Sequence, residues 1–526
     1  MKLLRNKKLV YLFLITFLLL LLKIDYRLIE AINCCQDDHD YFMHAETISV
    51  DFDLDYTNQL TGFESKRFNN NGKIAPKGFL GTGLLSAPFL FIGNFLDNLI
   101  PNTNLMNLGI LFYSFASIFY LFLSIFLLRS ILKQNNYNEK TFFIFLWVFG
   151  SGLPYFAFER YSMTHVFEIF TILLVMNYSN KYYLDKNQSK IYPILIPLFM
   201  LLGILVKWTN YYIFILPLFI KLIFEKQLNN EKKLINNKFF ILSGVFSILI
   251  FCYLSYEIYG KVTFNPQFVY GTSNLLGGFV SSEGNLINFL LTNIKNLFII
   301  LFTKEFGIFW FSAIIFSGLL INIILIFIDK NRLAFFVSLF IYAQTFGVVL
   351  MWKSTASSYG FRYLYNLVPL SIVLFVYFKN KYQYKIIEYY LSVFSVIGIL
   401  SLFFFETTEM TQLSEIDQLN SFGRNLRFTE PEYLVGFVYS FLELDSYLKI
   451  FTTSFFGLII FKILFLIFSP LTLINFLGNF GLPVNNPDFV EFTQKVEDIE
   501  IFKLFIVIIF ICILSKRLVD YFSLND

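Results

Sequence analysis

Three carboxylates stand within four residues near the N-terminus, at Asp37, Asp38 and Asp40, with His39 among them. A carboxylate in such a cluster can take a proton from a hydroxyl group during a reaction. Two neighbouring carboxylates can also hold a divalent cation beside a phosphate. Alternatively, the cluster is a solvated acidic turn at the end of a helix and has no catalytic role. The cluster is therefore a candidate for acid–base or metal-assisted catalysis.

Four basic or imidazole side chains follow later in the chain, each next to an apolar run: Lys77, His165, Lys207 and Arg362. The planar guanidinium of arginine fits phosphate oxygens with two parallel hydrogen bonds, and lysine supplies a point charge. A structural role is the alternative for each of them. Lys207, for example, precedes Trp208 and fits the interfacial belt of a membrane protein. Together the four predict a phosphate-binding site, provided that the fold brings them together.

The elements that must position these residues are membrane helices. The chain has 526 residues, of which 56% are hydrophobic and 15% charged, and its mean hydropathy is +0.63. Soluble proteins carry about 25% charged residues. The net charge of +4 is small, and no basic patch of the nucleic-acid-binding kind stands out. The chain is thus predicted to be an all-α polytopic membrane protein with no nucleic-acid partner.

Apolar runs predict about 11 to 13 transmembrane helices, since one crossing takes about 20 residues. Residues 79–96 are apolar but short, and Gly and Pro interrupt them, so we expect a juxtamembrane helix in the first outer loop. With that segment outside, the short inner loops are all rich in Lys and Arg. The expected crossings are 9–29, 105–128, 141–158, 164–180, 191–206, 209–224, 239–259, 306–328, 334–351, 363–378, 386–405 and 450–469, with 501–514 either crossing or interfacial.

This topology divides the chain at about residue 405. Residues 1–405 are expected to form a transmembrane catalytic core, with a first outer loop at 30–104 and a second at 260–305. Residues 406–526 are expected to form an outer segment and C-terminal membrane helices of unassigned role. The acidic cluster and the four cationic or imidazole groups then all fall on the non-cytoplasmic face.

The order of these motifs resembles the membrane glycosyltransferases of the GT-C fold, in particular the branch related to protein O-mannosyltransferases and lipid A aminoarabinose transferase. Asp37-Asp38 stands where that family opens its first periplasmic loop with a short acidic motif. Many members have Arg where this chain has Lys207. The other similar segments are 53–58, 77–88, 162–165, 207–210 and 359–363.

The resemblance implies a GT-C-like bundle and a hexosyl- or pentosyltransferase whose donor is a polyprenyl-phosphate-linked sugar. Asp37 would be the general base, with Asp38 assisting it or binding a divalent metal, and the sugar would be transferred with inversion. Lys77, His165, Lys207 and Arg362 would stabilise the departing lipid phosphate, whose negative charge grows in the transition state. A divalent metal cofactor is compatible with these residues but not required by them.

The same resemblance implies a multi-pass protein of the cytoplasmic (inner) membrane, in contact with membrane lipids, with its active site on the outer, periplasmic face. The resemblance does not identify the acceptor molecule. Two other functions stay open as alternatives: a transporter or flippase of lipid-linked glycans, and a polymerase or ligase of such glycans. A transporter places ionisable groups near the bilayer midplane, and Lys462, inside the apolar run 450–469, is a feature of that kind.

Overall fold

The computed structural model describes most of the chain. The described residues are 15–16, 19–20, 36–60, 72–99, 107–185, 189–225, 233–266, 286–302, 307–352, 361–382, 384–404, 447, 450–451, 454–479, 484, 487–499 and 501–525. Within these ranges the regular elements are helices and none is a β-strand, which confirms the prediction of an all-α protein.

The helices follow the apolar runs of the sequence closely. In chain order they are α2 (Gln36–Glu46), η3 (Thr47–Asp51), α4 (Gly81–Leu99), α5 (Leu108–Gln134), α6 (Thr141–Phe149), α7 (Leu153–Phe158), α8 (His165–Leu184), α9 (Ile191–Val206), η4 (Tyr211–Phe214), α10 (Leu216–Ile223), η5 (Leu234–Asn236), α11 (Lys238–Tyr259), α13 (Leu286–Phe302), α14 (Ile308–Phe311), α15 (Ala313–Ile328), α16 (Arg332–Trp352), η7 (Arg362–Leu367), α17 (Val368–Tyr382), α18 (Lys385–Phe404), α23 (Phe455–Ile467), α24 (Pro470–Asn479), α25 (Pro487–Asp498) and α26 (Ile501–Asn525).

Several of these helices are long and apolar enough to cross a bilayer, and the chain is an integral membrane protein. Among the described residues, four helices meet the criteria of length and composition, in α5, α11, α16 and α18. α23 and α24 make a fifth span if they count as one, although a bend of 113° separates them. The expected total of about 11 to 13 crossings stays a prediction, and most of the expected first helix, 9–29, lies outside the described residues.

The structure breaks some of the expected single crossings into two pieces. Residues 141–158 form α6 and α7, because the chain turns at Gly152, whose φ of 87° is a left-handed conformation that suits glycine. A Cβ on Gly150 would lie 2.5 Å from the backbone of Ser395 in α18, so this turn packs directly against a neighbouring helix. Both expected outer loops also contain helices, α2 in the first and α13 in the second.

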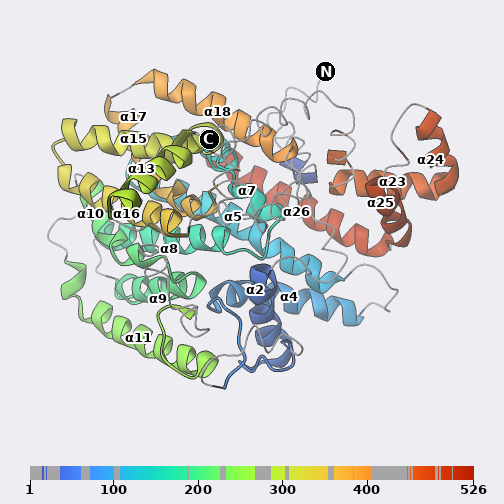
Figure 1. Ribbon diagram of the computed structural model, residues 1–526, viewed down its shortest axis with the longest axis horizontal. Helices are drawn as coiled ribbons and strands as arrows, with labels where there is room; N and C mark the ends of the chain where they lie inside the picture. The colour runs from blue at the N-terminus through green and yellow to red at the C-terminus, as the bar shows by residue number, and fades with distance from the viewer. Residues whose placement is uncertain are drawn as a thin grey trace.

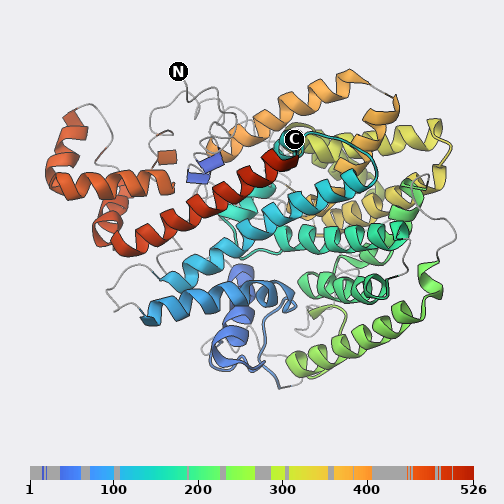
Figure 2. The same ribbon diagram turned by 180° about the vertical axis from the view of Figure 1, so that it is seen from behind.

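The core that carries the site is built from α4, α5, α8 and α9. α5 packs against α4 and against α8, and α8 also packs against α9 (Figure 1). α4 buries mostly small residues and exposes apolar ones, including Leu84, Phe91 and Phe95. Seen from behind, α26 runs beside α5 (Figure 2), where the rings of Phe510 and Phe115 have centroids 4.4 Å apart.

Candidate functional site

A small polar pocket lies where α2, the 77–79 turn, α8, the end of α9 and η7 meet. Its volume is about 80 Å³. A water molecule needs roughly 15 Å³ of such space, so the pocket has room for a group the size of a phosphate. The residues that line it are Asp40, Tyr41, Lys77, Gly78, Phe79, Met163, Thr164, His165, Val206, Lys207, Trp208, Thr209, Arg362 and Tyr363.

The structure brings all four of the predicted cationic or imidazole residues to this pocket. Lys77, His165, Lys207 and Arg362 line it together, although they are separated by up to 285 positions in the sequence. Three ammonium or guanidinium groups and one imidazole around so small a space form a site suited to an anion. The roles that the sequence assigns to them individually remain proposals.

The acidic cluster divides between the pocket and the protein interior. Asp40 lines the pocket, whereas Asp38 does not. Asp38 is buried and accepts a hydrogen bond of 2.7 Å from Nε of Arg160, whose side chain is also buried. A buried ion pair of this kind ties α2 to the link between α7 and α8. Asp37 is the second residue of α2, and its side chain lies outside the described part of the structure.

α2 holds the turn that carries Lys77 by two hydrogen bonds one helical turn apart. Oδ2 of Asp40 accepts a 3.1 Å hydrogen bond from the backbone N–H of Lys77. Nε2 of His44 donates to the carbonyl of Gly78 at 2.9 Å, and Nδ1 accepts from the hydroxyl of Tyr56 at 2.7 Å. Burial lowers the pKa of His44 to about 4, against a smaller opposing effect of the Gly78 carbonyl. His44 is therefore neutral at physiological pH, and in that state its Nδ1 accepts from the Tyr56 hydroxyl.

Glycines let the surrounding elements approach closely. A Cβ on Gly78 would lie 2.5 Å from a ring carbon of Tyr41, which covers the turn. A Cβ on Gly81 would lie 2.3 Å from the backbone nitrogen of Val206, directly before Lys207. A Cβ on Gly83 would lie 2.3 Å from Cβ of His44 on α2. The missing side chain thus lets α4 pack closely against the end of α9 at Gly81 and against α2 at Gly83.

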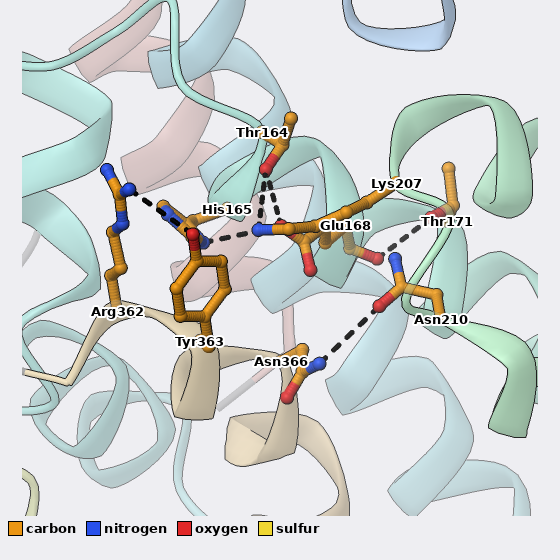
Figure 3. Close-up of polar contacts among 9 residues, drawn as sticks. All are labelled: Thr164, His165, Glu168, Thr171, Lys207, Asn210, Arg362, Tyr363 and Asn366. Atoms are coloured by element: carbon orange, nitrogen blue, oxygen red, sulfur yellow. Dashed lines mark hydrogen bonds and ion pairs between the residues drawn. The ribbon is translucent and has the colours of Figure 1, made fainter. Parts of the chain in front are cut away.

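A buried carboxylate beneath the pocket was not anticipated from the sequence. Oε1 of Glu168 accepts hydrogen bonds from Nζ of Lys207 at 3.0 Å and from Oγ1 of Thr164 at 2.5 Å. The same oxygen lies 3.3 Å from Nδ1 of His165 (Figure 3). The only sequence signal is an acidic residue in the first turn of α8, which also suits an ordinary helix start.

Tyr363 forms a platform for two of the cations. Nζ of Lys207 lies 4.3 Å from the centroid of its ring, and Cζ of Arg362 lies 5.1 Å from the same centroid. Nη2 of Arg362 also donates a 3.3 Å hydrogen bond to the Tyr363 hydroxyl. Both cations are attracted to the negative face of the ring. The structure thus draws Lys207 and Arg362 together despite their like charges.

The described side chains bear on whether a metal ion could be held here. Among the described side chains, no three His, Cys, Asp or Glu residues lie close enough together to hold a metal ion. The predicted alternative, a divalent cation on Asp37 and Asp38, depends on the Asp37 side chain, which lies outside the described part. It stays a prediction.

Comparison with known proteins gives matches among solved structures alone. No protein-family model matches the chain, and no curated protein sequence matches it. The apo oligosaccharyltransferase of Archaeoglobus fulgidus is 13% identical, with a TM-score of 0.43 over 78% of this chain and 56% of that chain. The oligosaccharyltransferase AglB of the same organism, in complex with an inhibitory peptide and a dolichol-phosphate, is 12% identical, with a TM-score of 0.38 over 82% of this chain and 60% of that chain. This chain spans less than two thirds of the length of both.

Proposed function

We propose that the protein is a membrane glycosyltransferase that moves a sugar from a polyprenyl-phosphate carrier to an acceptor hydroxyl. The observation that carries the proposal is the pocket itself: Lys77, Lys207 and Arg362 converge with the Asp40 carboxylate on one phosphate-sized space. α5, which packs against α8, is apolar enough to cross a bilayer, and α9, which ends at the pocket, is a shorter apolar helix. A lipid carrier would reach such a site from the membrane, and the cations would bind its phosphate.

In the proposed reaction the acceptor hydroxyl loses its proton to a carboxylate and forms a bond to the anomeric carbon of the sugar. The bond between that carbon and the phosphate oxygen breaks, and its electron pair leaves with the lipid phosphate. The three cations stabilise the negative charge that grows on the phosphate. Attack opposite the leaving group inverts the anomeric centre. This reaction would take place on the non-cytoplasmic face of the inner membrane.

We assign the general base to Asp40, because it is the acidic residue among the described ones that lines the pocket. The sequence pointed to Asp37, with Asp38 assisting. Asp38 is engaged by Arg160 and serves the fold. Asp37 remains the alternative base, because residues three apart on a helix lie on the same face, and position 37 precedes Asp40 by one turn.

Binding and transfer can be tested separately. Purified protein in lipid nanodiscs should bind polyprenyl phosphate, and Arg362→Gln should weaken that binding about tenfold, the loss of one charge-assisted contact of about 1.4 kcal/mol. Arg332→Gln, an exposed arginine at the start of α16, is the matched control and should bind normally. Equal affinity in the Arg362 variant would remove that residue from the site.

Native membranes supply the acceptor for the second test. With polyprenyl-phosphate sugars labelled in the sugar, the wild-type protein should move label out of the lipid-extractable fraction. Asp40→Asn should slow this transfer at least about 100-fold while polyprenyl phosphate still binds. Label that crosses the bilayer still attached to its lipid would identify a transporter instead. Lys462 no longer favours that alternative, since its Nζ donates to the carbonyls of Val496 and Glu497 at the end of α25.

A further inference from the structure

Glu168 is a buried acidic residue in contact with the pocket wall, and the proposed reaction does not use it. Its side chain is 1% exposed, and it does not itself line the pocket. A carboxylate buried to this extent is costly unless it is paired and hydrogen-bonded. Lys207 supplies the charge, and Thr164 supplies a second hydrogen bond. Glu168 is thus held in place as an anion, with its Oε1 directed at His165.

The contact with Glu168 bears on which nitrogen of His165 carries the proton. An ionised carboxylate can only accept hydrogen bonds. With its Oε1 3.3 Å from Nδ1, hydrogen on that nitrogen is favoured over a lone pair facing the anion. In a neutral imidazole the other nitrogen, Nε2, then has a lone pair and no hydrogen. Lys207 and Arg362 flank the ring (Figure 3), and a third positive charge between them would be repelled. The neutral ring with hydrogen on Nδ1 is therefore the favoured state.

A ring in this state cannot donate a hydrogen bond to a phosphate. Its Nε2 can only accept one, and a hydroxyl of a sugar or an acceptor is a group that can donate it. Figure 3 shows the imidazole between Arg362 on one side and Glu168 with Lys207 on the other, so the edge away from Glu168 faces the Arg362 side of the pocket. Phe156 packs edge-on against the ring at 4.5 Å between centroids and fixes its plane.

We propose that Glu168 is a positioning residue that makes His165 a hydroxyl-binding group rather than a contact of the phosphate. The proposal rests on the proposed function and changes the role that the sequence suggested for His165. The cations Lys77, Lys207 and Arg362 bind the phosphate, and His165 accepts a hydrogen bond from a substrate hydroxyl beside it. That hydroxyl belongs either to the transferred sugar or to the acceptor.

The tautomer can be measured directly, because the chain has three histidines. Protein labelled with ¹⁵N-histidine, with the His165 signals assigned by their loss in His165→Gln, should show hydrogen on Nδ1 and a bare Nε2. Glu168→Gln should shift the population toward hydrogen on Nε2, since an amide N–H can donate to Nδ1. Asp329→Asn, which alters a buried carboxylate bound to Lys381 and Tyr377, is the control and should leave the His165 signals unchanged. Hydrogen on Nε2 in the wild-type protein would overturn the proposal without any variant.

Binding assays then separate a hydroxyl contact from a phosphate contact. His165→Phe keeps an aromatic ring and removes both nitrogens. If the hydroxyl is on the sugar, this variant should bind the polyprenyl-phosphate sugar about tenfold more weakly, since one lost hydrogen bond is worth about 1.4 kcal/mol, and bind bare polyprenyl phosphate as the wild type does. If the hydroxyl is on the acceptor, both lipids should bind normally and the KM for the acceptor should rise.

An equal loss of affinity for both lipids would show that His165 contacts the phosphate, and the proposal would be wrong. That outcome leaves the proposed function intact, because the lipids still bind and the wild type still transfers sugar. Failure of the wild-type protein to bind either lipid would instead contradict the proposed function.

Discussion

At the scale of single residues, the site depends on how each charge is compensated. Asp38 forms an ion pair with Arg160, and Glu168 forms one with Lys207. Asp40 accepts a hydrogen bond from the backbone N–H of Lys77. All three carboxylates are buried, and of the three Asp40 lines the pocket. A carboxylate already paired in the interior is a poor proton acceptor, whereas one on the wall can meet a substrate. We therefore propose that Asp38 and Glu168 are structural acids and that Asp40 is the reactive one.

Asp38→Asn tests this division. The change leaves the buried Arg160 guanidinium without the Asp38 carboxylate, and breaking a buried pair costs about 3 to 5 kcal/mol. We expect a fall of many degrees in the unfolding temperature of the detergent-solubilised protein. Replacing both partners, as Asp38→Leu with Arg160→Leu, should recover part of the loss because no buried charge remains. A variant that unfolds like the wild type but has lost transfer would return Asp38 to the catalytic group.

At the scale of elements, two contacts of α2 and α4 position the cations. α2 clamps the Lys77 turn through Asp40 and His44, and α4 lies against the end of α9 through Gly81. Neither contact depends on a long side chain that could move aside. The pocket is therefore expected to be largely preformed before a ligand binds.

The His44 clamp should make stability depend on pH. The pKa of His44 is about 4 in the folded protein against 6.5 when unfolded, because burial disfavours the charged ring. Above pH 6.5 both states are neutral at this residue and it adds no pH dependence. As pH falls from 6.5 to 4 the unfolded state alone takes up the proton, so the free energy of unfolding drops by on the order of 3 kcal/mol.

The measurement is the unfolding temperature between pH 7 and pH 4 for the wild type and for His44→Gln. Carboxyl groups titrate over part of this range in both proteins, so the difference between the two curves isolates the histidine. The wild type should lose more stability than the variant as the pH falls. Parallel curves would show that His44 is already accessible to protons in the folded protein.

Gly81→Ala tests the packing of α4. The new Cβ would lie 2.3 Å from the nitrogen of Val206, and a backbone atom cannot rotate away. Overpacking of this kind typically costs about 1 to 3 kcal/mol, and the shift should also weaken polyprenyl phosphate binding by moving Lys207. Gly244→Ala is the matched control, since a Cβ there meets no atom within 4 Å. If the two variants behave alike, close packing at Gly81 does not position the site.

Much of the helical architecture could be read from the sequence, and part of the site could not. The length of an apolar run marks a helix well: the expected 191–206 is α9 at Ile191–Val206. The rotation of a helix about its axis is not visible in a short polar segment. Residues two apart on a helix point to nearly opposite sides, so Asp38 and Asp40 cannot both face the pocket. The sequence does not show which of the two does. Glu168 was missed for the same reason.

At the scale of the whole molecule, the C-terminal helices form a separate layer against the core. The residues that line the pocket lie between positions 40 and 363, and none belongs to α23, α24, α25 or α26. These helices contact the core through aromatic rings, with Phe510 of α26 against Phe115 and Phe112 of α5. Phe115 also stacks on Phe455 of α23. We therefore expect this layer to brace α5 rather than to contribute to the proposed site.

Phe510→Ala should separate these two roles. Removing the ring takes away an aromatic contact worth about 0.5 to 1.5 kcal/mol beyond the buried area, so the unfolding temperature should fall by several degrees. Polyprenyl phosphate binding should stay within about twofold of the wild type at temperatures where the protein is folded, a change below about 0.5 kcal/mol. Phe505→Ala removes an exposed ring from the same helix and should change neither property. A loss of binding in the Phe510 variant at full folding would mean that the C-terminal layer transmits its position through α5 to the pocket, and residues 406–526 would then belong to the catalytic unit.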